Sequence, residues 1–275
     1  MQVNHCSNCN ALNREEDRYC SKCGQEAHVH RFTLAHIFHE FFHAFTHADK
    51  GIFFLLKELL IRPGVVAMEY VNGKRKKYFS PFTFFLILAG LFVLSNTFFR
   101  PTDAHQKVEI PANIQSIQDP VKKAESVQMF GRAMKAKYFT AKYGNVIAMI
   151  AVPFFALFFW LIYFKKQYNY AEHFVANILF VSFSNLAFTL LVFPLEALAK
   201  NTPWIAIIPL IGLITQVVYY TYAYKGFMQI KGFFGGAKVF LQSLIGIVIW
   251  VMLSMTFMAI YIYQNIHFLD FFKRM

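Results

Sequence analysis

Long runs of apolar residues, separated by polar segments, fill most of the chain after residue 78. A helix needs about 20 apolar residues to cross a bilayer. Five runs come close to or exceed that length, and none has a charged residue near its centre. The pattern therefore predicts an all-α polytopic membrane protein with about five transmembrane helices. These spans are expected near residues 79–99, 146–164, 174–195, 204–224 and 239–263, within a membrane domain of residues 79–275.

Residues 28–78 also show helical spacing, but no stretch there is both long and apolar enough to cross a bilayer. Residues 33–50 place phenylalanine and isoleucine on one face of a helix. Residues 52–61 are apolar apart from one lysine and one glutamate, and the sequence Arg62-Pro63-Gly64 ends this second helix. We expect two interfacial amphipathic helices, followed by a basic turn at residues 74–77.

The first 27 residues form a polar head that contains every cysteine of the chain, arranged as two C-x2-C pairs. Two such pairs can present four thiolates to one metal ion, which is typical of a zinc ribbon. Asn10 and Gly24 follow the two pairs, and both tolerate the left-handed backbone that such a turn needs. The head is too small to bury a core, so its folding would depend on the metal. The predicted ligands are Cys6, Cys9, Cys20 and Cys23.

The closed set of four sulfur ligands favours one structural zinc ion per chain over a catalytic metal. Two alternatives remain open for the same residues. An iron site would use the same four thiolates, and two disulfides would form if the head lay in an oxidising compartment.

Composition supports a membrane protein, since 57% of the residues are hydrophobic and only 15% are charged, against about 25% charged in an ordinary soluble domain. The formal net charge is +12, and the basic residues lie mostly outside the apolar runs. This placement favours contact with anionic lipid headgroups. No basic groove interleaved with aromatic residues is visible, so the bilayer is the expected partner and nucleic acid is not.

The basic cluster at residues 74–77 directly precedes the first span and favours a cytoplasmic position for that end. The basic residues of the segment 100–145 weaken this argument, but reduced cysteines also fit the cytoplasm. No apolar leader precedes the cysteines, so no secretory signal peptide is expected. We expect a multi-pass protein of the cell inner (cytoplasmic) membrane with a cytoplasmic N-terminus.

Two pairs of ionisable residues are further candidates for function. Glu172 and His173 stand at the mouth of the third span, where an ionisable pair can be functional. Glu172 could equally serve the helix by interacting with the positive end of its dipole. Lys74 and Arg75 belong to the basic turn before the first span.

A stripe of histidines in residues 36–47 is the third candidate. His39 and His43 are four residues apart on the polar face of the predicted helix, so together they could chelate a metal ion. The alternative is the polar face of an interfacial helix that meets lipid phosphates. The complete stripe consists of His36, His39, Glu40, His43 and His47.

Short motifs follow one another in a fixed order through the N-terminal third of the chain and again at the third span. They are Cys20-Ser21-Lys22-Cys23-Gly24-Gln25, Arg31-Phe32-Thr33, Lys50-Gly51, Arg62-Pro63-Gly64, Glu69-Tyr70, Gly73-Lys74-Arg75, Tyr78, Pro81 and Tyr170-Ala171-Glu172-His173. In this order the motifs resemble an uncharacterised bacterial membrane protein family with an N-terminal zinc ribbon, the domain-of-unknown-function family 3667. The resemblance implies this architecture and no established activity. Members of that family often carry further histidines after the Glu-His pair, and residues 174–183 here have none.

These patterns favour an integral membrane protein of unknown molecular activity, and a non-enzymatic one. Its zinc ribbon would either dock a cytoplasmic protein or stabilise the membrane domain. A transporter or channel for a small solute or lipid is the alternative, with Asn177, Asn185 and Gln216 as candidates to line the path. A membrane lipid-modifying enzyme that uses the His36–His47 stripe is the second alternative. The sequence carries no signal for an oligomeric state.

Overall fold

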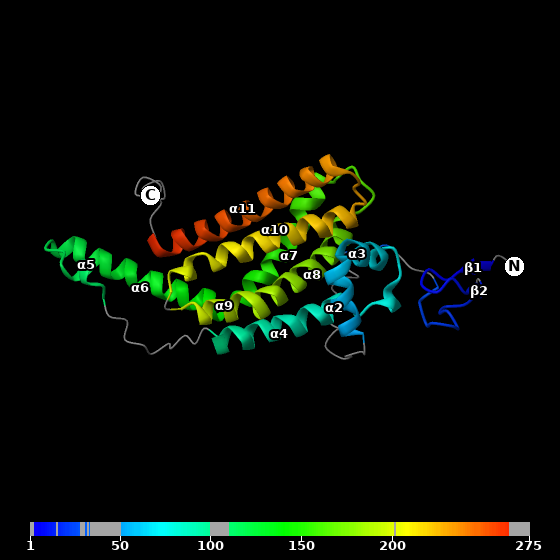
Figure 1. Ribbon diagram of the computed structural model, residues 1–275, viewed down its shortest axis with the longest axis horizontal. Coiled ribbons are helices and arrows are strands. Elements are labelled where there is room, and N and C mark those ends of the chain that lie inside the picture. The colour runs from blue at the N-terminus through cyan, green and yellow to red at the C-terminus, as the bar shows by residue number, and fades with distance from the viewer. Residues whose placement is uncertain are drawn as a thin grey trace.

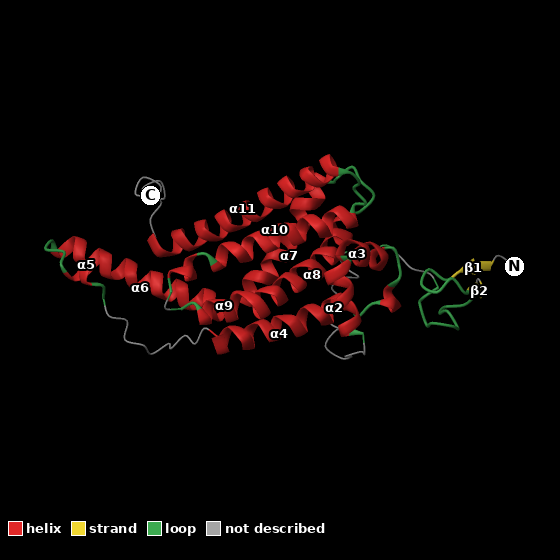
Figure 2. Ribbon diagram, in the orientation of Figure 1, coloured by secondary structure: helices red, strands yellow, loops and turns green. Residues whose placement is uncertain are grey.

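The computed structural model describes residues 3–14, 16–27, 31, 33, 51–99, 110–200 and 202–263. A small head with two short strands lies at one end of a long helical body (Figures 1 and 2). The strands β1 (Val3–His5) and β2 (Leu12–Arg14) pair antiparallel, with Val3 opposite Arg14. The last turns of the final described helix lie at the other end of the body.

Long apolar helices run alongside one another through the body (Figure 1). One of them, α8, continues through a π-helical turn, η2, into the short helix α9. The segments are α4 (Pro81–Phe99), α7 (Gly144–Ile162), α8 (Tyr170–Ala187), η2 (Phe188–Val192), α9 (Phe193–Leu198), α10 (Ile208–Phe227) and α11 (Phe233–Tyr263).

Four segments of the described chain are long and apolar enough to cross a membrane: Arg75–Phe99, Tyr170–Leu198, Pro203–Phe227 and Phe233–Ile262. They correspond to the first, third, fourth and fifth expected spans. The second expected span coincides with α7, whose apolar stretch Val146–Ile162 is shorter than these four segments. The protein is therefore a helical membrane protein, and its described residues include four candidate spans and one shorter apolar helix.

The outer faces of these helices are apolar, as lipid contact requires. Without a membrane, such residues would form an exposed hydrophobic surface much larger than monomeric soluble proteins carry. Exposed examples from the long helical segments are Leu157, Leu191, Ile214, Val248 and Phe257. The space between the helices is filled by other apolar residues, so the helices bury one face against each other and turn the opposite face outward.

Aromatic rings from three helices fill the centre of the body. Phe159 of α7 stacks on Tyr224 of α10 with ring centroids 3.6 Å apart. Phe155 meets Tyr220 at 5.0 Å, and Phe180 of α8 meets Tyr224 edge-on at 5.6 Å. Aromatic pairs with centroids 4.5–7 Å apart, as in the Phe155–Tyr220 and Phe180–Tyr224 pairs, each add roughly 0.5–1.5 kcal/mol beyond burial alone. The abundant phenylalanine and tyrosine thus hold α7, α8 and α10 together.

Further helices lie at the two ends of the body (Figure 1). At the head end lie α2 (Ile52–Ile61), α3 (Pro63–Val71) and the 3-10 turn η1 (Arg75–Lys77). Towards the other end lie α5 (Ala112–Gln115), α6 (Pro120–Lys142) and the 3-10 turn η3 (Pro203–Ala206). The bounds of α2 confirm the helix expected at residues 52–61.

Helix α3 packs against α8 and α10, and buries Val66 and Ala67 completely. Its first residue is Pro63, which suits a position where the backbone N–H would have no helical partner. We expected Gly64 to provide a turn, but it lies inside α3. A Cβ atom there would come within 2.2 Å of the Ala223 carbonyl oxygen and 2.3 Å of the Phe227 nitrogen. Glycine is therefore required because the backbones of α3 and α10 touch.

Candidate metal centre

The head presents its two cysteine pairs on two similar turns. In the first turn the Asn10 N–H donates to the Cys6 carbonyl at 2.9 Å, and in the second the Gly24 N–H donates to the Cys20 carbonyl at 2.8 Å. Asn10 has a φ of 61° and Gly24 a φ of 69°. Both values lie in the left-handed region, which confirms the backbone expected after each pair.

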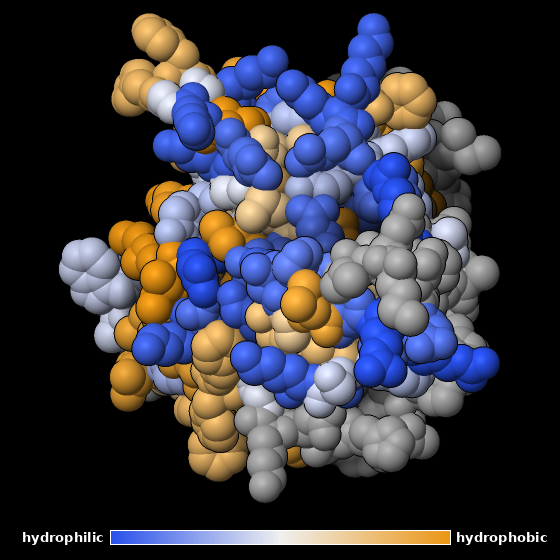
Figure 3. Space-filling view, turned by 90° about the vertical axis from the view of Figure 1, so that its right-hand side faces the viewer, coloured by the Kyte–Doolittle hydropathy of each residue, from blue (hydrophilic) through white to orange (hydrophobic). Residues whose placement is uncertain are grey.

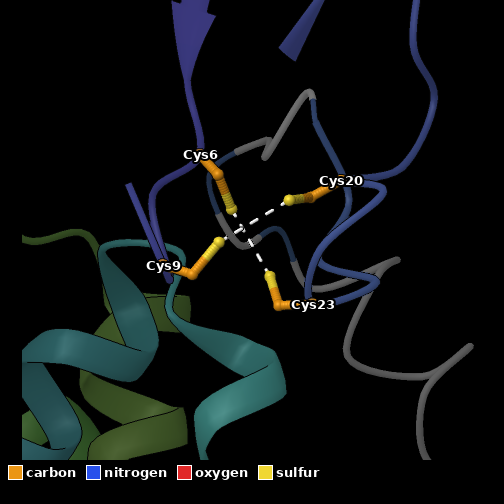
Figure 4. A group of neighbouring side chains, drawn as sticks. All are labelled: Cys6, Cys9, Cys20 and Cys23. Carbon is orange, nitrogen blue, oxygen red and sulfur yellow. Dashed lines mark hydrogen bonds between the residues drawn. The ribbon is translucent and has the colours of Figure 1, made fainter. Parts of the chain in front are cut away.

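The four sulfur atoms converge between these turns (Figure 4). The Sγ atoms of Cys6 and Cys23 lie 3.6 Å apart, as do those of Cys9 and Cys20. All four lie within 4.8 Å of one another. A disulfide requires about 2.05 Å between its sulfurs, and all four cysteines are free thiols here.

This arrangement fits one metal ion. Zinc–sulfur bonds of about 2.3 Å in a tetrahedron place the sulfurs about 3.8 Å apart, and the two closest pairs differ from that value by little. Cys6 and Cys20 are buried, whereas Cys9 and Cys23 are partly exposed. The four cysteines together could therefore bind a metal ion, as the spacing predicts.

Side-chain contacts join the head to the basic turn of the body. The side chain of Gln25 is buried, and its Oε1 accepts a hydrogen bond from the backbone N–H of Lys76 at 2.9 Å. The Ser7 hydroxyl donates to the Gly73 carbonyl at 3.4 Å. Both contacts join residues more than 50 positions apart in the sequence. Ser7 directly follows the predicted ligand Cys6, and Gln25 lies two positions after the predicted ligand Cys23.

Glu172 begins α8 and is held by a second contact with the N-terminal region. Its carboxylate receives two hydrogen bonds from the Arg31 guanidinium, at 2.8 and 2.6 Å. These bonds and the negative charge of Glu172 raise the pKa of Arg31. Glu172 also forms a capping box with Asn169, which satisfies the first backbone N–H groups of α8. The Glu172 side chain therefore caps the start of α8 and also forms an ion pair with Arg31.

His173 is fully buried between α7, α8 and α10. Rings surround it: Tyr224 at 6.0 Å and Tyr163 at 6.5 Å lie parallel to the imidazole, and Phe227 at 5.5 Å stands edge-on. Among the described residues, neither ring nitrogen of His173 has a hydrogen-bond partner. The two neighbours Glu172 and His173 therefore have different surroundings, and a functional role for the pair stays a prediction.

The three residues expected to line a transport path have different surroundings. Asn177 is buried one turn after His173, and its Nδ2 donates to the Tyr224 hydroxyl at 2.5 Å and to the His173 carbonyl at 2.8 Å. Such bonds commonly hold membrane helices together. Asn185 is partly buried in α8, and Gln216 lines a cavity beside α10.

Lys74 and Arg75 lie in the basic turn, where Lys74 contributes to a charge cluster around Glu69 of α3. The Glu69 carboxylate accepts hydrogen bonds from Lys77 at 2.5 Å, the Tyr78 hydroxyl at 2.6 Å and Lys74 at 3.1 Å. Burial raises the pKa of Glu69, but these three bonds outweigh it and lower the pKa to about 2. The cluster fixes the turn on which the head rests.

We expect the Glu69 cluster to stabilise the protein above pH 4.5 and to lose that contribution as the pH falls from 4.5 towards 2. The sign follows from a folded-state pKa of about 2, which lies below the ordinary value of 4.5. Thermal unfolding of wild type and Glu69→Gln across this range measures the effect. The variant should melt a few degrees lower at pH 7, and the difference between the two proteins should shrink on acidification. A constant difference would contradict the assignment.

The remaining candidates, His39 and His43 with the rest of the His36–His47 stripe, lie outside the described residues, so a site there stays a prediction. Sequence reasoning assigned no contact to Gln25, Arg31 or Glu69. A signal for them existed, since all three belong to the short motifs of the N-terminal third.

Comparisons with known proteins support one segment of the chain. Residues 49–93 match the model of a family described as Protein of unknown function (DUF3667). The matched segment covers α2, α3, the basic turn and much of α4, and so includes Gly64 and Glu69 but no cysteine. This segment is similar to an uncharacterised family, as the motifs indicate. No curated protein and no solved structure matches the chain significantly.

Proposed function

We propose that this chain is a non-enzymatic protein of the bacterial inner membrane whose cytoplasmic N-terminal head is a structural zinc ribbon. One zinc ion bound by Cys6, Cys9, Cys20 and Cys23 would hold the head folded. The folded head would in turn stabilise the membrane domain by resting on the basic turn before the first span. The supporting observation is the hydrogen bond from the Lys76 backbone to the buried side chain of Gln25.

The donor set supports a structural metal. Four thiolates complete a tetrahedron around zinc and leave no open position for water or substrate. Gln25 follows the last ligand by two residues, so the turn that positions Cys23 also positions the Gln25 amide. Metal binding and contact with the body would therefore be coupled in one small unit.

Basic residues at the head end support a cytoplasmic position for it. Lys74–Lys77 and the short loops after α7 and α10 lie there, and the surface seen from that end is strongly hydrophilic around its centre (Figure 3). Lysine and arginine are enriched in cytoplasmic loops. The segment containing α6 is also basic and lies at the opposite end, so reduced thiols provide the second argument for this orientation.

A cytoplasmic protein is the partner that the head would take if it docks one. Leu12 and Tyr19 leave 66% and 63% of their surfaces exposed on the head. Exposed apolar and aromatic side chains of this kind favour protein contacts. The stabilising role has stronger support because it rests on contacts within the chain itself.

Replacing Gln25 with alanine should release the head from the body without removing the metal. The Lys76 N–H loses its acceptor in this variant, so we expect hydrogen–deuterium exchange of the peptide around residues 73–78 to become about tenfold faster. Metal content should remain at one ion per chain.

Glu26→Ala is the matched control because Glu26 is the neighbouring residue and its side chain is exposed. It should leave exchange unchanged. The stabilising role would be refuted by unchanged protection in Gln25→Ala with the metal still bound.

A further inference from the structure

A cavity of about 160 Å³ lies between the second half of the α8–η2–α9 segment and the first half of α10. Most of its lining is aliphatic or aromatic, and Phe183 and Tyr219 form one wall with stacked rings 4.8 Å apart. Leu191, Leu195 and Ile211 line it as well and expose much of their surface on the lipid-facing side of the body. The cavity can therefore be reached from the bilayer.

The backbone around the cavity departs from regular helix geometry. The π-helical turn η2 ends at Val192, two residues before Pro194. In a regular α-helix the ring of Pro194 would collide with the carbonyl of Leu190. On the opposite wall, a Cβ atom at Gly212 would lie 3.0 Å from the Phe188 ring and 3.2 Å from Val192. Single π-helical turns in α-helices occur frequently at functional sites.

Four polar residues interrupt this apolar lining, namely Ser184, Thr215, Gln216 and Tyr219. Two of them carry a hydroxyl without a partner among the described residues. Ser184 is only 5% exposed, and its hydroxyl has no hydrogen-bond partner among the described residues. The hydroxyl of Tyr219 is also buried without a partner within that part of the chain. By contrast, Ser182 donates to the Ile178 carbonyl of its own helix at 2.6 Å. A buried unpaired hydroxyl costs free energy that a ligand with a polar group can recover.

Depth in the membrane restricts what the ligand can be. Ser184 is the middle residue of the candidate span Tyr170–Leu198, so it lies near the centre of the bilayer if the segment crosses. The charged headgroup of a phospholipid lies about 15 Å or more from that plane. A polar group that meets Ser184 must therefore belong to an uncharged molecule that dissolves in the membrane interior.

Size and wall chemistry restrict the ligand further. A cavity of about 150 Å³ accommodates a benzene ring, and the stacked pair Phe183–Tyr219 offers an aromatic face to a planar ring. We propose that this cavity binds the ring of an uncharged lipophilic molecule that carries a hydroxyl or carbonyl group, with Ser184 and Tyr219 as its hydrogen-bond partners.

Fluorine NMR of the full chain in nanodiscs tests the proposal with two probes of matched shape, 4-fluorophenol and 4-fluorotoluene. At equal concentrations in the bilayer, we expect the wild type to bind 4-fluorophenol at least about fivefold more tightly, since one added hydrogen bond is worth roughly that factor. The double variant Ser184→Ala, Tyr219→Phe should lose this preference. Ala187→Leu, which fills the cavity from its lining, should lose binding of both probes.

The control is the double variant Ser182→Ala, Tyr261→Phe. It removes the same two oxygen atoms at positions that do not line the cavity, and it should behave as wild type. Equal binding of the two probes by wild type would overturn the proposal, because the cavity would then accept any hydrocarbon, including an acyl chain. Retained preference in the Ser184 and Tyr219 double variant, or undiminished binding in Ala187→Leu, would overturn it too.

Discussion

Serine at position 20 should abolish metal binding and unfold the head. Cys20 is buried, and its sulfur is one of only four that could hold the ion. Structural zinc sites of this kind contribute about 10–16 kcal/mol of apparent binding free energy, and a head of this size has no core that could replace it. Elemental analysis should find one zinc per chain in wild type and none in Cys20→Ser. Exchange protection at Lys76 should be lost in the same variant, because Gln25 no longer has a fixed position.

Ser21→Ala provides the control, since Ser21 is the adjacent residue, is exposed and offers no sulfur. It should keep both the metal and the protection. If elemental analysis finds iron in the wild type, the four ligands remain as proposed and the metal is iron instead of zinc. One metal ion per chain in Cys20→Ser would contradict a metal site made of the four cysteines.

Gly64→Ala should be the most damaging single methyl group added to the helical body. The new Cβ atom would meet the backbone of α10 at 2.2–2.6 Å, and backbone atoms cannot move aside as a side chain can. Overpacking of a buried contact usually costs about 1–3 kcal/mol, and we expect Gly64→Ala to reach or exceed the upper end of that range. Thermal unfolding in a mild detergent measures the loss.

Alanine substitutions at two other glycines provide comparisons for this prediction. Gly90 lies in α4, and a methyl group added there would have nothing within 4 Å, so Gly90→Ala should be neutral or stabilising by up to about 1 kcal/mol. At Gly226, which faces Gly64, the nearest atom is 3.1 Å away, and alanine should have an intermediate effect. Equal melting temperatures for Gly64→Ala and Gly90→Ala would show that α3 does not touch α10 as described.

Features that depend on short stretches of sequence were predictable. The apolar runs indicated helices at the first, third, fourth and fifth expected spans, because hydropathy over about 20 residues governs membrane insertion. The cysteine spacing indicated a four-sulfur cluster, since two turns with left-handed residues at Asn10 and Gly24 present their thiolates in a standard way. The helix at residues 52–61 followed from its apolar run and the proline after it.

Features that depend on contacts between distant residues were not predictable. The role of Gly64 required the position of α10, the separate surroundings of Glu172 and His173 required Arg31 and Tyr224, and the Gln25–Lys76 bond required the docked head. No local pattern encodes such pairs, even though one member of each pair, such as Gly64, Gln25 or Glu172, belongs to the short motifs.

The membrane helices and the cluster of four cysteines in the head follow from the amino-acid sequence alone. Hydropathy and residue spacing act over short distances along the chain, so they can be read directly. The folded structure was needed to show that the head rests on the turn before α4, that α3 packs against α10, and that a cavity opens beside the π-helical turn. Each of these depends on the packing of segments far apart in the sequence, and packing is a property of the assembled helices.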